Sequence, residues 1–485
     1  MSNTVLGKSL SKLYELYCEN GGRVTTDSRT VRAEAERREG VGPVFFALKG
    51  EQFDGNDYAV QAVADGAVAA VVHDKLPKGV KADSEEAARY IVVKDTLAAL
   101  QELAAHHREV LGLPVLALTG SNGKTTTKEL ITRVLRTKYR VACTRGNLNN
   151  HIGVPLTLLS ITDEDDVAVV EMGANHQGEI AALCAIARPD MGLITNVGRA
   201  HLEGFGGPEG VRLGKGELYD YLAQHGGTAF YAADDGVLSS MVAERFGATA
   251  TGVAVAYRAE SLGVSAAAET PNDRLCLRTD RGTVETGMTG RYNWANVAAA
   301  LAVGDYFGVD TEAAVKAIAA YHPDNNRSQV AVSIRGTGNV LYMDAYNANP
   351  SSMSAALDNF LELPMTPDEE SGKVVILGDM RELGDYAGQE HEVVITRLLH
   401  TQQTNTDALL TCYLVGSEFG KAWEAVQAKM EEEGDTAASH SCIKTFPDAQ
   451  SLLEALQNGA ISIRQAQVLI KGSRGMALET LYSAL

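Results

Sequence analysis

Cysteine chemistry, export signals and membrane spans are all missing from this sequence. The six cysteines are scattered, with no CxxC pair and no zinc-ligand spacing, so neither a disulfide framework nor a structural zinc site is expected. The N-terminal stretch lacks the apolar core of a signal peptide, and no segment approaches the roughly 18 consecutive apolar residues of a membrane span. We therefore expect a cytoplasmic protein without membrane insertion.

Basic residues are outnumbered, and proline is sparse. The 43 Lys and Arg against 62 Asp and Glu give a formal net charge of −19. Such a charge repels polyanions and argues against nucleic-acid binding as the main activity. Proline occurs 12 times and glycine 47 times. That balance indicates a folded chain with many tight turns between strands and helices, not a disordered one.

The chain is long and its apolar pattern is regular. Its 485 residues exceed what one hydrophobic core can organise. Short apolar runs alternate with helical patterns throughout, which is typical of βαβ units and parallel sheets. We predict an α/β protein of three domains. They span residues 1–110, 111–323 and 324–485.

One glycine-rich loop carries the strongest chemical signal. The apolar run 115–118 leads into it and an apolar helical stripe follows. In that setting backbone N–H groups hold phosphate, Lys124 reaches the outer phosphates and the Thr125 hydroxyl binds Mg²⁺. Leu118 stands where the GxxxxGK[ST] pattern has its first glycine, so the alternative is a glycine turn before a chance Lys–Thr pair. The residues predicted to bind ATP here are Gly120, Ser121, Asn122, Gly123, Lys124, Thr125 and Thr126.

Three further polar residues follow predicted elements. Glu171 comes directly after the strand 167–170, and His201 follows the strand 192–195 by a short loop. Ligands of parallel sheets lie beyond these carboxyl ends, so both side chains can contact a magnesium ion. Glu171 can equally be a helix cap or half of an ion pair, and His201 a plain loop histidine. Lys215, judged on spacing alone, is a solvated helical lysine.

Several longer segments resemble the Mur ligase family, and the resemblance spans nearly the whole chain. The loop TGSNGKTT has the family's shorter form of the phosphate-binding pattern, which accounts for Leu118. The segment 171–180, EMGANHQGEI, is the most specific match. The other matching segments are 26–29, 48–55, 147–155, 291–296, 344–350 and 377–384.

The resemblance implies a fold and an activity. We expect a central P-loop parallel-sheet ATPase domain, flanked by an N-terminal α/β domain that binds a UDP-linked substrate and a C-terminal Rossmann-like domain. The expected enzyme is an ATP-dependent carbon–nitrogen ligase that adds D-alanyl-D-alanine to UDP-N-acetylmuramoyl-tripeptide through an acyl phosphate. This is the last cytoplasmic step in making the peptidoglycan precursor. ATP and Mg²⁺ are the implied cofactors, and we expect a monomer.

The resemblance also implies residue roles. The expected catalytic residues are Lys124, Lys215, His201 and Arg327, the last reaching the γ-phosphate. The expected metal ligands are Thr125, Glu171, His201 and, if carbamylated by CO₂, Lys215. The remaining nucleotide contacts are Asn293, Asn296, Asp344 and Asn347. The expected contacts of the UDP-linked substrate are Asp27, Ser28, Arg29 and Asn150. Tyr292 departs from the histidine common in the family.

Two alternatives stay open. Another ligase on the same scaffold can add a single amino acid to a UDP-muramoyl peptide, although the Asp-Asn-Pro-Arg signature common in the ligase that adds the third residue is missing. The second alternative is a non-catalytic ATP-binding protein on the same scaffold. The joint presence of Glu171, His201 and Lys215 disfavours it.

Overall fold

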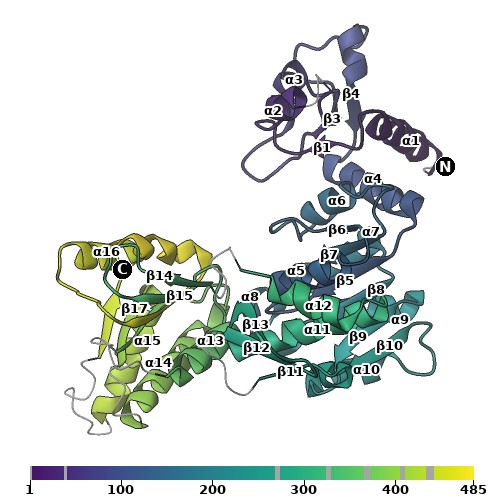
Figure 1. Cartoon of the computed structure of the whole chain (residues 1–485). Coiled ribbons are helices and arrows are strands. Elements are labelled where there is room, and N and C mark those ends of the chain that lie inside the picture. The colour runs from purple at the N-terminus through teal and green to yellow at the C-terminus, as the bar shows by residue number, and fades with distance from the viewer. Residues whose placement is uncertain are drawn as a thin grey trace.

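Three α/β units follow one another along the chain in the computed structural model (Figure 1). The structure describes residues 3–37, 41–267, 274–323, 329–364, 372–404, 410–432 and 442–485. The N-terminal unit lies at one end of the central unit, and the C-terminal unit lies beside the central one. In the described ranges, no helix is both long and apolar enough to cross a membrane. The three-unit α/β architecture confirms the predicted fold class.

The N-terminal unit is built on a parallel sheet of strand order β1-β2-β3-β4. Every residue of β3 is buried, as expected for a strand covered on both faces. The strands are β1 (Val24–Thr25), β2 (Val44–Phe46), β3 (Ala69–His73) and β4 (Tyr90–Val93). The helices are α1 (Asn3–Glu19), α2 (Val31–Glu36), α3 (Asn56–Ala64), the 3₁₀ turn η1 (Glu85–Arg89) and α4 (Thr96–Leu111), which leads into the central unit.

The central unit has a six-stranded parallel sheet of order β10-β9-β8-β5-β7-β6. The chain leaves β5 toward β6 and β7 on one side and later crosses to β8 on the other, so the loop after β5 lies where the strand order reverses. Ligands of open α/β sheets bind at such points. The strands are β5 (Val115–Thr119), β6 (Val141–Cys143), β7 (Val167–Glu171), β8 (Met191–Ile194), β9 (Thr228–Ala232) and β10 (Val253–Tyr257).

Helices cover both faces of this sheet. The predicted apolar stripe of α5, formed by Leu130, Ile131, Val134 and Leu135, is fully buried, which confirms the strand–loop–helix order around the glycine-rich loop. The helices are α5 (Lys124–Leu135), α6 (Gly153–Leu158), α7 (Glu179–Ala187), α8 (Leu202–Phe205), α9 (Pro208–His225), α10 (Gly236–Arg245), η2 (Ala259–Leu262), η4 (Arg291–Asn293), α11 (Trp294–Tyr306) and α12 (Thr311–Ala319).

A small antiparallel sheet, absent from our predictions, packs onto the central unit. It has the order β11-β12-β13, with β11 (Ser265–Ala266), β12 (Arg274–Thr279) and β13 (Gly282–Thr289). Leu275 and Leu277 of β12 are fully buried and join the hydrophobic core around α5 and α11. Charged residues and glycines interrupt the apolar pattern of β12 and β13 in the sequence, which concealed the strands.

The C-terminal unit has a second six-stranded sheet, of order β14-β15-β19-β16-β17-β18, with β14 antiparallel at one edge. Because the last strand, β19, inserts between β15 and β16, the carboxyl ends of β15 and β19 lie side by side. The strands are β14 (Gln329–Val332), β15 (Val340–Asp344), β16 (Lys373–Gly378), β17 (Leu410–Val415), β18 (Ile443–Phe446) and β19 (Gln467–Lys471). The helices are α13 (Pro350–Glu362), η5 (Gly384–Tyr386), α14 (Ala387–Thr404), α15 (Ser417–Glu432), α16 (Ala449–Gln457), η7 (Arg474–Met476) and η8 (Leu478–Ser483).

Asp379, in the segment 377–384, has a structural role. Its carboxylate accepts hydrogen bonds from the backbone N–H groups of Glu418 (3.1 Å) and Phe419 (2.9 Å), in the first turn of α15. Gly416 has φ +121°, and a Cβ there would lie 2.2 Å from this carboxylate. The glycine therefore leaves the space in which Asp379 caps the helix.

Replacing Asp379 by alanine leaves two N–H groups without their acceptor, one of them buried. We expect Asp379→Ala to lower the free energy of unfolding by about 1–2 kcal/mol, the usual cost of losing such a cap. Thermal unfolding followed by circular dichroism measures the change. Asp448→Ala, at the exposed start of α16, is the control and should cost less. Equal, small shifts in both variants would contradict the assigned role.

Candidate active site

A cleft of about 710 Å³ opens between the central and C-terminal units. The central unit contributes the glycine-rich loop and residues after β6, β7 and β8, and the C-terminal unit contributes residues after β15 and β19. Hydrogen bonds join the walls. Asn349 Nδ2 donates to Asn122 Oδ1 (2.8 Å), and the Arg199 backbone N–H donates to Ser351 Oγ (2.8 Å). The Arg199 side chain also forms an ion pair with the buried Glu390 of α14.

Two glycines of the loop after β5 have conformations that other residues rarely adopt. Gly120 has φ +141°, and a Cβ there would lie 2.0 Å from Thr195 Oγ1. Gly123 has φ +78°, and its Cβ would lie 2.4 Å from Asn296 Oδ1. Both positions therefore require glycine, because neighbouring side chains lie too close for a Cβ atom. The Lys124 ammonium curls back and donates to the carbonyl of Gly120 (2.7 Å).

The loop does not present all of its N–H groups to the cleft. The N–H of Ser121 donates to Asn196 O (3.0 Å), and the N–H of Asn122 donates to Asn196 Oδ1 (3.0 Å). Gly123 is the residue before α5, and the first N–H groups of any helix have no partner within the helix. We propose that phosphate is held by the N–H groups of residues 123–126, while 121 and 122 brace the loop against the segment after β8.

Glu171 ends β7 in the floor of the cleft and is 1% exposed. Its Oε1 accepts from Asn149 Nδ2 (2.8 Å) and from the Thr125 hydroxyl (3.3 Å). Its Oε2 is buried, and no group of the described residues forms a hydrogen bond with it. A buried carboxylate oxygen without a partner is costly, and a bound cation removes the cost.

The Glu171 site therefore suits Mg²⁺, which prefers oxygen ligands and takes few of them from the protein. In the described residues, no group of three or more His, Cys, Asp or Glu side chains could hold a metal unaided. Phosphate oxygens of a bound nucleotide would complete the coordination. The roles of Thr125 and Glu171 as metal ligands are proposed on this basis.

His201 also reaches the cleft, from the end of the segment after β8. Its backbone is left-handed, with φ +54°, and its Nδ1 pairs with the Glu382 carboxylate of the C-terminal unit. This hydrogen bond lowers the pKa of Glu382. Because Nδ1 is taken, Nε2 is the ring nitrogen available to a metal ion.

Lys215 is not the solvated lysine that its spacing indicates. It lies in α9, is 1% exposed, and donates to the Ala174 carbonyl (3.2 Å). Its Nζ also lies 4.9 Å from the centre of the Phe205 ring. Burial, and secondly the charge of Lys124, lower its pKa well below the usual value. Lowering the pKa enriches the neutral amine, which is the form that reacts with CO₂.

Asn293 and Asn296 lie beneath the phosphate loop. Both are buried, although both border the cleft. Asn296 Oδ1 accepts from the Thr127 hydroxyl (2.9 Å), and its Nδ2 donates to Asn293 Oδ1 (2.8 Å). Asn293 Nδ2 in turn donates to Thr289 O (2.7 Å). The two amides join α11 to α5, and their contact with adenine stays a prediction.

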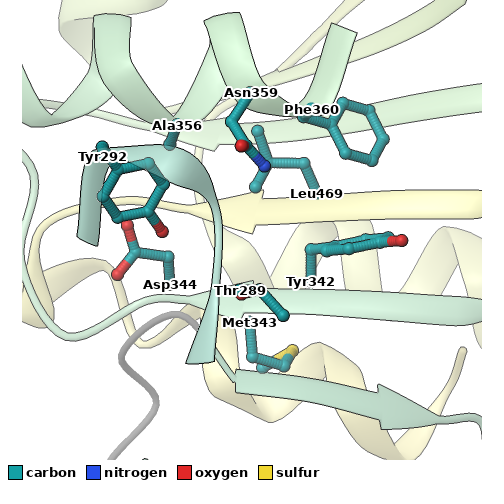
Figure 2. A pocket seen from close by; sticks show the side chains of 9 residues that line it. All are labelled: Thr289, Tyr292, Tyr342, Met343, Asp344, Ala356, Asn359, Phe360 and Leu469. Atoms are coloured by element: carbon teal, nitrogen blue, oxygen red, sulfur yellow. The ribbon is translucent and has the colours of Figure 1, made fainter. Parts of the chain in front are cut away.

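Asp344 and Lys471 form the facing wall. Lys471 is 1% exposed and donates to Asp344 Oδ2 (2.5 Å) and to Asn347 O (3.1 Å). Asp344 also lines the small cavity in Figure 2, in which the Tyr292 ring lies next to the Asp344 carboxylate. Tyr292 thus occupies the boundary between the two units, since it comes from η4 and lines both hollows. Nucleotide binding by Asp344 and Asn347 is proposed from these positions.

The predicted substrate-binding residues are less concentrated. Asp27 and Arg29 form a bidentate ion pair at the surface of the N-terminal unit, which lowers the pKa of Asp27. In the ranges that the structure describes, neither they nor Ser28 borders the cleft. Asn150 does border it and accepts from the N–H of Gly153 (2.9 Å). Arg327 lies outside the described residues.

Four residues of this site were not among the predicted site residues. Asn149 orients Glu171, Asn196 braces the phosphate loop, Glu382 holds His201 and Lys471 holds Asp344. Asn196 follows β8 by two residues and Lys471 is the last residue of β19, so their position at the end of a strand is the sequence signal that marks them. Asn149 and Glu382 are recognised only by their contacts in the folded structure.

Sequence comparison decides the family. Three family models match in chain order: "Mur ligase family, catalytic domain" over residues 23–108, "Mur ligase middle domain" over 118–304, and "Mur ligase, glutamate ligase domain" over 326–474. The chain is 33% identical over 488 aligned residues to the UDP-N-acetylmuramoyl-tripeptide--D-alanyl-D-alanine ligase of Bacillus subtilis, covering 100% of this chain and 97% of that one. The chain belongs to the Mur ligase family.

Solved structures support the Mur ligase assignment. MurF from Acinetobacter baumannii has 32% sequence identity and a TM-score of 0.75, with 95% of this chain and 92% of that one covered. The MurF ligase of Thermotoga maritima, in complex with ADP, has 26% identity and a TM-score of 0.72, with 94% and 95% covered. The resemblance stated from the motifs is therefore confirmed for the whole chain.

Removing the charge of Glu171 tests the metal site. We expect Glu171→Gln to weaken binding of Mn²⁺, a spectroscopic substitute for Mg²⁺, by at least about 10-fold in the presence of ADP. Electron paramagnetic resonance of free Mn²⁺ measures the affinity. Glu179→Gln is the matched control, because Glu179 also lines the cleft but its oxygens accept from Asn175 N–H and bind His176. Equal affinities in the two variants would exclude Glu171 as the ligand.

Proposed function

We propose that this chain is an ATP-dependent ligase that joins D-alanyl-D-alanine to UDP-N-acetylmuramoyl-tripeptide. One observation carries the proposal: a phosphate loop and a buried carboxylate face Asp344 and Lys471 across a single cleft, in a chain similar over its full length to ligases of that name. The product is the UDP-linked pentapeptide from which peptidoglycan is made. ATP is the phosphate donor, and Mg²⁺ is the resident metal.

The first step activates the tripeptide. Its free carboxylate attacks the γ-phosphorus of ATP, and the bond between that phosphorus and the bridging β-phosphate oxygen breaks. The tripeptide becomes an acyl phosphate, and ADP is the leaving group. The Lys124 ammonium and the N–H groups of 123–126 hold the phosphates, so their charge is stabilised and their position fixed. Bound Mg²⁺ supplies further charge neutralisation at the phosphate oxygens. Arg327 is the proposed contact of the transferred phosphoryl group.

The second step forms the amide. The amino group of D-alanyl-D-alanine attacks the acyl carbon, inorganic phosphate leaves, and the amine gives up a proton. Two substrates and ATP must meet for this, which requires groups from both walls of the cleft. The contacts of Asn349 with Asn122 and of Ser351 with Arg199 hold the C-terminal wall close to the phosphate loop. We propose that Asp27, Ser28 and Arg29 bind the UDP end of the tripeptide.

The setting of the enzyme follows from its substrates. ATP and UDP-linked precursors are made in the cytoplasm, and we propose that the protein works there as a monomer.

The domain boundaries at residues 110 and 323 are likewise proposed. They fall close to the gaps between the matched family segments, at 109–117 and 305–325.

Product formation tests the proposal directly. The purified protein is incubated with ATP, Mg²⁺, the UDP-linked tripeptide and D-alanyl-D-alanine, and phosphate release is measured. We expect release that depends on the dipeptide. Lys124→Ala should reduce the rate by at least about 1,000-fold, because it removes the cation that stabilises transferred charge, while circular dichroism stays unchanged. Dipeptide-independent release, or full turnover by Lys124→Ala, would refute it.

The reactivity of Lys215 gives a second test. We expect mass spectrometry under bicarbonate to detect a CO₂ adduct that is lost on acidification. Because burial lowers the pKa of Lys215, a larger share of its amine is neutral at a given pH than in a free lysine, and activity at limiting CO₂ should fall as the pH is lowered. Lys215→Ala should be inactive and regain turnover with short carboxylic acids. Lys128 is also a buried lysine, but its ammonium donates to the Thr144 carbonyl. Lys128→Ala is therefore not equivalent to Lys215→Ala in this test. Failure of rescue together with an unmodified Lys215 would contradict carbamylation.

A further inference from the structure

The incoming dipeptide carries a free carboxylate, and the cleft must compensate that charge. We propose that Arg474 binds the terminal carboxylate of D-alanyl-D-alanine and makes the enzyme selective for it. The inference rests on the proposed function, because it names the group that recognises the second substrate of that reaction.

Three described lysine and arginine side chains line the cleft, Lys124, Lys471 and Arg474, and the two lysines have partners within the protein. Lys124 donates to carbonyl groups of the phosphate loop, and the buried Lys471 is paired with Asp344 at 2.5 Å. Arg474 lines the same cleft and is exposed. In the part of the chain that the structure describes, no carboxylate forms an ion pair with Arg474. It is therefore available to an anionic ligand.

The Tyr346 ring lies beside the guanidinium of Arg474. Arg474 opens η7 directly after β19, and the preceding Ser473 is buried, with its Oγ accepting from the Arg381 N–H (3.0 Å). The guanidinium lies 5.4 Å from the centre of the Tyr346 ring. Stacking on an aromatic face leaves the edge of the guanidinium free. That edge matches a carboxylate with two parallel hydrogen bonds.

The other anions of the reaction have recognition groups elsewhere. The phosphates of ATP have the loop N–H groups and Lys124 on the central unit. The reacting carboxylate of the tripeptide is consumed when the acyl phosphate forms, so it needs no permanent counter-ion. The UDP group has the proposed signature residues of the N-terminal unit. The dipeptide carboxylate keeps its charge throughout the second step, and Arg474 reaches the cleft from the wall opposite the phosphate loop.

Arg381 provides a matched control. It is also an exposed arginine, and its side chain contacts the same turn, donating to Gly475 O (3.4 Å). Unlike Arg474, it is not among the described residues that line the cleft. Arg381→Gln thus makes the same change in charge beside the same turn, outside the site.

The experiment changes both partners of the contact. Steady-state kinetics are measured with D-alanyl-D-alanine and with its C-terminal amide, which lacks the carboxylate, for the unaltered protein, Arg474→Gln and Arg381→Gln. We expect Arg474→Gln to raise KM for the dipeptide by roughly 10- to 100-fold, as for loss of a charge-assisted pair. KM for ATP and for the UDP-linked tripeptide should stay unchanged, as in Arg381→Gln. For the unaltered protein, KM for the amide should exceed KM for the dipeptide by a similar factor. For Arg474→Gln, the two KM values should be equal.

Several outcomes would overturn the inference. One is an Arg474→Gln variant that still prefers the acid to the amide by the original factor. Another is a rise in KM for ATP in place of the dipeptide, which would assign Arg474 to phosphate. Arg474→Lys, which keeps the charge but loses the planar fork, should recover part of the preference and decides the matter if the glutamine variant does not fold. No turnover by the unaltered protein would overturn the proposed function itself.

Discussion

A buried carboxylate oxygen without a hydrogen-bond partner is the constraint on which the cleft depends. Glu171 lies in the floor of the cleft with its Oε2 unsatisfied, at a cost of about 1–3 kcal/mol or more for a charged group. A bound cation with its phosphate ligands offsets that cost. Thr125 and Asn149 donate to the other oxygen, so this one side chain links the end of β7 to the first turn of α5 and to the loop after β6. Because no described group of the protein bonds this oxygen, the position favours a bound metal ion.

The second requirement is that two separately folded units share one site. The segment after β8 meets it, because it braces the phosphate loop through Asn196, binds the C-terminal unit through Arg199 and ends at His201. A movement of the C-terminal unit would therefore act on a proposed metal ligand and on the phosphate loop together. Because of this coupling, the proposed metal ligand His201 and the second wall of the cleft can reach their positions at the same time.

Much of the fold follows from patterns in the sequence. The fully buried strands β5, β7 and β19 are continuous apolar runs, and the stripe of α5 repeats at helical spacing, so their type is visible without contacts. The antiparallel strands β12 and β13 were missed because each has a solvent-facing side that breaks the run with charge and glycine. Their apolar residues are recognisable only against the helices that cover them.

For the site, the sequence by itself determined the chemistry of single elements. A glycine-rich loop between a strand and a helix binds phosphate because local geometry directs its N–H groups, and Glu171 lies at the sheet edge because it directly follows a strand. Only the tertiary structure decided that Lys215 and Lys471 are buried, since helical or turn spacing does not reveal what packs against a face. It also placed Arg474 across the cleft from the phosphate loop, because that position depends on how the sheets of two units meet.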